Sequence, residues 1–151
     1  MVFIILVGAS AFGLVFREFG GDDWIVGMIK ESQLSPYVFL TMVLIAIFFA
    51  GFFIDFIEII FIFMPVVVPV FRELHLDMLW IAVLVAVNLQ TSFLTPPFGF
   101  SLFYLKGVAP PSITTGHLYR GIVPFVLLQG LVLGLLVIFP ELITWLPKFV
   151  R

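Results

Sequence analysis

Residues 88–99 read Asn-Leu-Gln-Thr-Ser-Phe-Leu-Thr-Pro-Pro-Phe-Gly and lie in the middle of an apolar segment that covers residues 78–105. Neither Pro96 nor Pro97 can donate a backbone N–H, so a helix loses two of its hydrogen bonds here. A proline also disfavours the helical conformation of the residue before it, which is Thr95. The stretch therefore predicts a helix that is broken in its middle.

The unwound part is expected to extend from Thr91 to Gly99, because glycine tolerates backbone angles that other residues avoid, with the helix resuming near Phe100. At membrane depth such a break is tolerated only where it is buried in protein or lines a wet cavity. Its polar side chains are all uncharged and oxygen-bearing: Asn88, Gln90, Thr91, Ser92 and Thr95. This arrangement is typical of a small-ion or substrate site in a transporter. The alternative is a proline kink whose free carbonyls are satisfied by neighbouring Ser and Thr.

Composition predicts an all-α integral membrane protein. The 151 residues are 63% hydrophobic and 11% charged, with a mean hydropathy of +1.29. Soluble domains are about 45–50% apolar and about 25% charged. The net charge of −2 and the lack of a basic patch argue against a nucleic-acid partner. The absence of Cys excludes disulfides, thiolate catalysis and cysteine-ligated metals. Both histidines, His75 and His117, are expected to be solvated loop residues.

Residues 37–71 form a second apolar segment, too long for one span of about 20 residues and too short for two spans with a turn. The length predicts a re-entrant helical hairpin with its tip at residues 50–55. Asp55 and Glu58 are carboxylates three residues apart in this segment, where an ionisable group costs ~2.5–3.5 kcal/mol or more. Asp55 is expected either to line the site or to cap the returning arm, with Glu58 beside it in the first turn. The returning arm contains two prolines that are expected to kink or end it: Pro65 and Pro69.

The remaining segments predict a polytopic protein. Residues 2–16 are apolar but short for a span and lack a signal-peptide pattern, so we expect the chain to begin inside a transmembrane helix of a longer protein. Residues 23–34, with Asp22-Asp23 as a cap, fit an amphipathic helix at the membrane interface or a solvated connector. Residues 118–139 fit one clean span that Pro140 stops, followed by an interfacial tail. Small residues in two segments are expected to let helices pack closely: Gly8, Ala9, Ser10, Ala11, Gly13, Gly130 and Gly134.

These features together resemble a known family, the large membrane subunit of the TRAP (tripartite ATP-independent periplasmic) transporters. The resemblance covers nearly the whole chain and corresponds to the C-terminal third of such a subunit, the second of two inverted repeats. It rests on the following residues: Gly51, Asp55, Pro65, Pro69, Asn88, Thr95-Pro96-Pro97-Phe98-Gly99, Pro124 and Pro140. The departure is Thr91-Ser92-Phe93-Leu94, where many relatives place a glycine before the Thr-Pro-Pro.

The resemblance implies an elevator fold of the ion-transporter superfamily, in a multi-pass protein of the bacterial inner membrane. Residues 1–36 would supply a scaffold helix and an interfacial helix. Residues 37–107 would belong to the mobile transport domain, with the hairpin at 37–71 and the discontinuous transmembrane helix at 78–107. Residues 108–151 would form a connector, the last transmembrane helix and the tail. The implied orientation puts 106–120 inside, whereas the positive-inside rule predicts the opposite.

The implied function is sodium-driven import of a small organic anion, a carboxylate or an acidic sugar. A periplasmic substrate-binding protein would deliver the anion, a small membrane subunit would complete the transporter, and sodium would be the coupling ion with no other cofactor. Matching the family's pattern gives these site residues: Gly51, Asp55, Asn88, Thr95, Pro96, Pro97 and Gly99. Thr91 and Ser92 are added for their hydroxyl groups. Sodium would bind through Thr91, Thr95 and nearby backbone carbonyls.

Two other classes of function fit parts of the sequence. One is a dicarboxylate–sodium symporter or a sodium–proton antiporter of the same superfamily, which works without a binding protein. The other is a membrane-embedded enzyme that uses Asp55 and Glu58 as an acid–base pair. The enzyme needs a nucleophile or a metal nearby, and the absence of Cys and of clustered His weakens it, so we expect a protein that is not an enzyme.

Overall fold

The computed structural model describes residues 2–32, 34–96 and 99–149, and within these ranges it contains helices and no strand, as the composition predicts. The helices are, in chain order, α1 (Val2–Glu18), α2 (Gly21–Glu31), α3 (Pro36–Ala50), α4 (Phe56–Glu73), α5 (Met78–Leu94), α6 (Phe100–Val108), α7 (Thr115–Ile138) and α8 (Glu141–Phe149).

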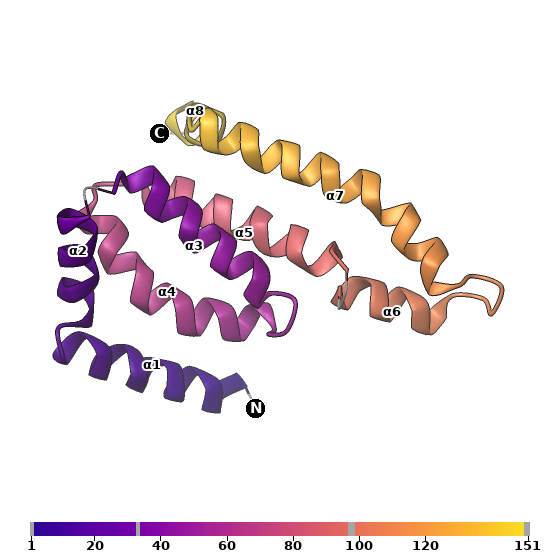
Figure 1. Cartoon of the computed structure of the whole chain (residues 1–151), viewed down its shortest axis with the longest axis horizontal. Coiled ribbons are helices and arrows are strands. Elements are labelled where there is room, and N and C mark those ends of the chain that lie inside the picture. Colours follow the sequence, from indigo (N-terminus) through magenta and orange to yellow (C-terminus); the bar gives the residue numbers. More distant parts are fainter. Residues whose placement is uncertain (1, 33, 97–98, 150–151) are drawn as a thin grey trace.

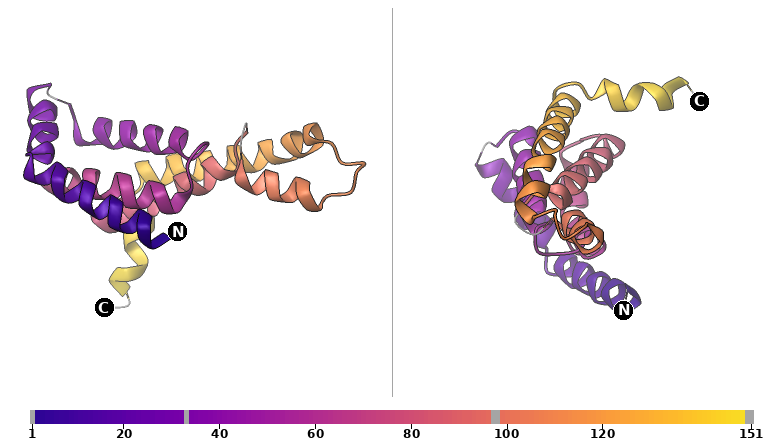
Figure 2. Two further views of the ribbon diagram at one scale, coloured as in Figure 1. Left: turned by 90° about the horizontal axis from the view of Figure 1, so that it is seen from below. Right: turned by 90° about the vertical axis from the view of Figure 1, so that its right-hand side faces the viewer.

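Most of the helices lie side by side, and α2 runs across the ends of its neighbours (Figure 1). α1 packs on α4, while α5 packs on both α3 and α7. The view along the long axis places α1 and α8 at opposite edges of the molecule (Figure 2). A hydrogen bond joins the beginning of α5 to the end of α7: the Trp80 indole Nε1 donates to the Leu136 carbonyl at 2.7 Å.

α3 and α4 form a helical hairpin whose tip, residues 51–55, lies where the sequence predicts it. Ser35 caps α3 by accepting from the backbone N–H of Val38 at 3.3 Å, and Pro36 occupies the first helical position, where its missing N–H costs little. The main hydrophobic core lies between α3, α4 and α5. Its most deeply buried side chains are Leu40, Ile47, Ile59, Phe71 and Leu84.

The two prolines of the returning arm do not end it. Pro65 and Pro69 lie inside α4, which continues to Glu73. Each proline removes one intrahelical hydrogen bond, but packing offsets the loss. A Cβ on Gly13 of α1 would lie 3.0 Å from the Cβ of Pro65, so the two helices are in close contact there. Gly13 thus confirms the predicted close packing, whereas a Cβ on Gly8, Gly130 or Gly134 would meet no atom within 4 Å.

α2 is a helix, as predicted, but its cap differs from the expectation. Gly20 is the N-cap in the left-handed conformation (φ 71°), and Asp22 and Asp23 lie in the first turn instead. Their charges still favour the positive end of the helix. Val26 and Ile29 form the buried face of α2 and pack against α4.

Both histidines are exposed, as expected; His75 lies in the turn after α4, whereas His117 lies in the first turn of α7 instead of a loop. His75 follows α4 with φ 56°, its N–H donating to the Arg72 carbonyl at 3.0 Å. His117 forms a capping box with Thr114 at the start of α7. The imidazole Nδ1 accepts from the Thr114 N–H at 3.2 Å, and the Thr114 hydroxyl accepts from the His117 N–H at 3.3 Å.

In the part of the chain that the structure describes, one helix, α7, is long and apolar enough by itself to cross a bilayer. α1 and α2 pass the same criterion only as a pair, and they are bent by 59° relative to each other. α3 and α5 are apolar but shorter, at 15 and 17 residues.

Candidate ion and substrate site

The helix break is real but shorter than the sequence predicts. α5 stays helical through Thr91 and ends at Leu94, and α6 begins at Phe100. Thr95 is extended (φ −87°, ψ 130°), as expected before a proline. The predicted unwinding from Thr91 is wrong: Pro96 cannot donate to the carbonyl four residues before it, but residues 91–94 keep their own N–H groups to donate to earlier carbonyls, and α5 stays helical through Leu94. Of the predicted site, Pro97 lies outside the described residues, as does Phe98.

Local hydrogen bonds satisfy part of the last turn of α5. The Thr95 N–H donates to the Ser92 carbonyl at 3.0 Å, and the Thr95 hydroxyl donates to the Thr91 carbonyl at 2.7 Å. The Thr91 hydroxyl donates in the same way to the Val87 carbonyl at 2.8 Å. Gly99 closes the break, with its N–H donating to the Thr95 carbonyl at 3.3 Å. The carbonyls of Thr91 and Ser92 are therefore engaged rather than free.

Two side chains of α5 reach across to the backbone of α3. The Asn88 amide Nδ2 donates to the Leu44 carbonyl at 2.8 Å, and the Ser92 hydroxyl donates to the Phe48 carbonyl at 2.7 Å. Donors and acceptors are each four residues apart, so each set lies on one face of its helix. Both side chains are buried, Asn88 with 2% and Ser92 with 0% of its surface exposed. The sequence did not reveal these acceptors, because a backbone carbonyl carries no residue signature.

Ser92 satisfies a carbonyl that α3 itself cannot. The last carbonyls of a helix have no partner within it. At the hairpin tip the Phe52 N–H donates to the Phe49 carbonyl at 3.2 Å, so the Phe48 carbonyl receives the Ser92 hydroxyl instead.

Gly51 allows the tip to approach α5 this closely. A Cβ at this position would lie 2.9 Å from the Cβ of Ser92 and would overlap its hydroxyl. The structure therefore brings together three of the predicted site residues, Gly51, Asn88 and Ser92, at the contact between α3 and α5. Thr95, Pro96 and Gly99 lie beyond them in the break.

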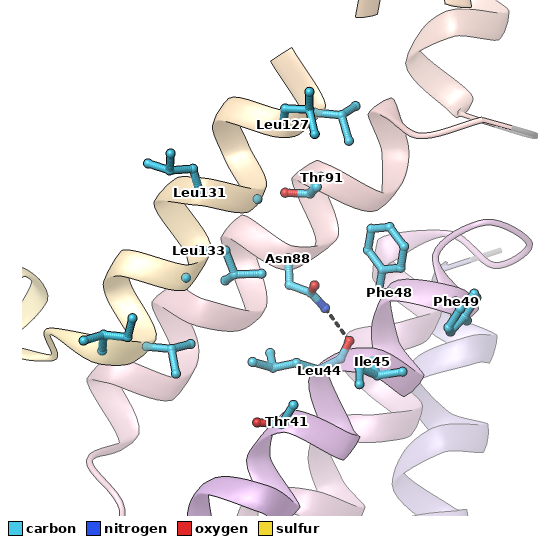
Figure 3. Close-up of a pocket in the computed structure, with 15 residues that line it drawn as sticks. Thr41, Leu44, Ile45, Phe48, Phe49, Asn88, Thr91, Leu127, Leu131 and Leu133 are labelled. Atoms are coloured by element: carbon cyan, nitrogen blue, oxygen red, sulfur yellow. Dashed lines mark hydrogen bonds between the residues drawn. The ribbon is translucent and has the colours of Figure 1, made fainter. Parts of the chain in front are cut away.

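A largely apolar pocket of about 840 Å³ opens between α3, α5 and α7 (Figure 3). Its polar side chains are Thr41, Asn88 and Thr91, and the Thr91 hydroxyl points toward α7 in Figure 3. The Asn88 hydrogen bond to the Leu44 carbonyl uses the amide nitrogen Nδ2, and the amide oxygen Oδ1 is a separate acceptor that this bond leaves available.

The two carboxylates of the hairpin, Asp55 and Glu58, lie in different surroundings. Asp55 is exposed and is the N-cap of α4, with its Oδ1 accepting from the Phe56 N–H at 2.7 Å. Glu58 is half-buried and lines a groove of about 480 Å³ against α1, together with Ala9 and Phe12. Neither carboxylate joins the contact between Gly51, Asn88 and Ser92.

The fold and the site define a class, an all-helical membrane protein in which a helical hairpin packs against an interrupted helix. Comparison with known proteins identifies the family. The model of the family described as "Tripartite ATP-independent periplasmic transporter, DctM component" matches residues 1–142. The chain therefore belongs to the family of large permease subunits of the TRAP transporters.

Several curated relatives carry this subunit's name. The chain is 32% identical over 114 residues to the sialic acid TRAP transporter permease protein SiaT of Haemophilus influenzae, an alignment that covers 76% of this chain and 18% of that protein. It is 28% identical over 147 residues to the C4-dicarboxylate TRAP transporter large permease protein DctM of Pseudomonas aeruginosa, covering 97% of this chain and 32% of that protein. The ectoine/5-hydroxyectoine TRAP transporter large permease protein UehC of Ruegeria pomeroyi is 28% identical over 146 residues, covering 97% and 34%. The chain thus spans about a third or less of the length of these relatives.

Proposed function

We propose that this chain is the C-terminal part of a permease that imports a small organic anion across the bacterial inner membrane, driven by sodium. A periplasmic binding protein delivers the anion, and a small membrane subunit completes the transporter. The relatives named for sialic acid and C4-dicarboxylates support an anionic substrate. The observation that carries the proposal is the break between α5 and α6, which is flanked by neutral oxygen groups and faced by the hairpin tip.

The hydroxyl groups at the break are arranged to suit a cation. The hydrogens of the Thr91 and Thr95 hydroxyls are already donated to backbone carbonyls, so each oxygen presents only lone pairs to other partners. The C-terminal end of α5 adds a partial negative charge, and discontinuous helices use such ends to coordinate sodium. The N-terminal end of α6 supplies the partial positive charge that an anionic substrate needs. Cation and anion are thereby favoured on opposite sides of the same break.

The length of α3 supports a re-entrant hairpin. α3 has 15 residues, which corresponds to ~22 Å, less than the ~30 Å hydrocarbon core. In the proposed elevator, residues 37–107 move as part of the transport domain, and residues 1–36 belong to the scaffold and its interfacial helix. The remaining segment, 108–151, supplies the connector, the span α7 and the interfacial helix α8.

Family membership bears on the two alternatives. The matching family is named for periplasmic, tripartite transport, which favours dependence on a binding protein over a lone symporter or antiporter. The relatives are transporter permeases, and Asp55 and Glu58 face different surroundings, which disfavours an acid–base pair.

Replacement of both prolines tests the proposal. In Pro96→Ala/Pro97→Ala, each proline removed from a helix favours the helix by ~3 kcal/mol. α5 and α6 then join into one helix, so the helix ends that the proposal assigns to the cation and the anion disappear. We expect uptake by the full-length permease, assayed in proteoliposomes with its small subunit and binding protein, to lose its sodium dependence.

The matched control is Pro110→Ala, which lies in the connector between α6 and α7 and should leave the sodium curve unchanged. Membrane insertion and expression are compared first, so that a loss of uptake reports the break itself. An unchanged sodium curve in the double variant would show that the prolines form only a structural kink.

A further inference from the structure

A second, polar pocket of about 250 Å³ lies at the corner where α1 ends, α2 begins and α4 ends. Five charged residues line it: Arg17 on α1, Asp22 and Asp23 on α2, and Arg72 and Glu73 on α4. Asp22 is half-buried and the other four are exposed. The pocket shares no residue with the break or with the pocket beside α7.

These five charges are not paired with one another. Within the described residues, no salt bridge or side-chain hydrogen bond joins either guanidinium to a carboxylate of the pocket. Opposite charges that surround one cavity without pairing are available to a ligand that carries both signs. A guanidinium is the side chain best suited to a phosphate, which it can hold with two parallel hydrogen bonds. Carboxylates suit an ammonium group that still carries N–H donors.

We expect the pocket to lie at the level of the lipid headgroups. α2 crosses the ends of α1 and α4 (Figure 1), and its bend of 59° from α1 turns the chain away from the direction of that apolar helix. Next to the pocket in sequence are two exposed aromatic residues, Phe19 and Trp24, with 87% and 68% of their surfaces exposed. Tryptophan is enriched at membrane–water interfaces, so the exposed Trp24 at the start of α2 is suited to anchor this corner at the membrane surface.

We propose that this pocket binds the zwitterionic headgroup of phosphatidylethanolamine. Arg17 and Arg72 hold the phosphate, while Asp22, Asp23 and Glu73 accept hydrogen bonds from the ammonium group. With two cations and three carboxylates, the lining carries one net negative charge, which disfavours a purely anionic lipid such as phosphatidylglycerol. Phosphatidylcholine has the same two charges, but its quaternary ammonium has no N–H to donate. A bound lipid would fix the corner between α1 and α2 to the membrane surface.

A methylation series of the lipid tests the proposal without altering the protein. The full-length permease with its small subunit is purified in detergent, and lipid retention is measured by native mass spectrometry. The lipids carry identical acyl chains and either zero, one, two or three methyl groups on the nitrogen, with phosphatidylglycerol added for comparison. We expect affinity to fall with each methyl group and to be about tenfold higher for phosphatidylethanolamine than for phosphatidylcholine or phosphatidylglycerol. Equal affinities, or a preference for phosphatidylglycerol, would overturn the proposal.

Substitutions then locate the binding. Arg72→Gln and Asp23→Asn should each weaken retention of phosphatidylethanolamine about tenfold, as expected for the loss of one charge-assisted contact. The control Arg120→Gln removes an exposed arginine at the start of α7 and should change nothing. Unfolding temperatures confirm that each variant is folded. Unchanged lipid retention in Arg72→Gln would overturn the proposal, and if that variant instead lost association with the binding protein, the pocket would belong to a protein interface.

Discussion

At the scale of single residues, Gly51 and Ser92 determine how closely the hairpin approaches α5. Ser92 supplies the hydrogen that the Phe48 carbonyl lacks, and Gly51 leaves the space in which Ser92 can do so. Asn88 repeats the same contact one turn earlier, on Leu44. The sequence predicts these residues as ion or substrate ligands; in the structure, the side-chain donors of Asn88 and Ser92 join α5 to α3. These contacts hold the last turns of α5, next to the break, against the hairpin.

Gly51→Ala should therefore weaken the contact. The new Cβ overlaps Ser92, so α3 has to shift, and overpacking of this kind costs ~1–3 kcal/mol. The unfolding temperature of the full-length permease should fall, and sodium-driven uptake with it. The control is Gly27→Ala inside α2, where a Cβ meets no atom within 4 Å and where alanine is the better helix former by ~1 kcal/mol. Equal unfolding temperatures for Gly51→Ala and the wild type would contradict the steric argument.

Asp55 can be tested by separating its charge from its capping oxygen. The side chain accepts from the Phe56 N–H and, as far as the described residues go, makes no hydrogen bond to α5. Asparagine caps a helix about as well as aspartate, whereas alanine costs ~1 kcal/mol. We expect Asp55→Asn to retain stability and sodium-driven uptake, and Asp55→Ala to lose ~1 kcal/mol of stability. Loss of uptake in a stable Asp55→Asn would instead assign the carboxylate to the ion site.

At the scale of the helices, the two histidines show how end geometry distinguishes residues that look alike in sequence. After α4, the His75 N–H donates to the Arg72 carbonyl and the Leu76 N–H to the Phe71 carbonyl at 3.1 Å, with His75 itself left-handed. This pattern is the helix ending that favours glycine. Before α7, by contrast, the His117 side chain completes a capping box.

Glycine at the two positions should therefore have opposite effects on the free energy of unfolding. His75→Gly removes the steric cost of a left-handed side chain and should stabilise by ~0.5–1 kcal/mol. His117→Gly loses half of the capping box and places glycine in a helix, so it should destabilise by ~1 kcal/mol. Thermal unfolding of the two variants of the full-length permease provides the comparison. A shift of the same sign in both would mean that end geometry does not decide their effect.

The sequence predicts an element correctly where residues close together in the chain determine it. The two adjacent prolines placed the break, and the uninterrupted apolar run placed α7. The extent of the break was not predictable in the same way. Residues 91–94 remain helical, and the backbone becomes extended only at Thr95, directly before Pro96. Pro65 and Pro69 remain inside α4 because contacts with α1 and the core, which no local rule describes, stabilise that helix. The groove that receives Glu58 depends on α1 in the same way.

At the scale of the whole molecule, the described helices leave much apolar surface without a partner. No described residue of α7 is buried, although its 24 residues are strongly apolar. On that helix the Oε1 of Gln129 is buried without a hydrogen-bond partner among the described residues, a situation that costs ~1–3 kcal/mol. In the complete permease, we expect a donor from another segment to reach Gln129.

The 151-residue chain by itself should therefore not transport. It covers 32% and 34% of two permeases of its family. In the proposed two-repeat elevator, one hairpin with one broken helix would supply only one of the two repeats around the site. We expect vesicles that contain only this chain to show no substrate accumulation under a sodium gradient, even with a binding protein present. The full-length permease with its small subunit, reconstituted at the same protein-to-lipid ratio, is the positive control. Accumulation driven by the short chain alone would show that one repeat can form the whole pathway, and it would overturn the proposed two-repeat elevator.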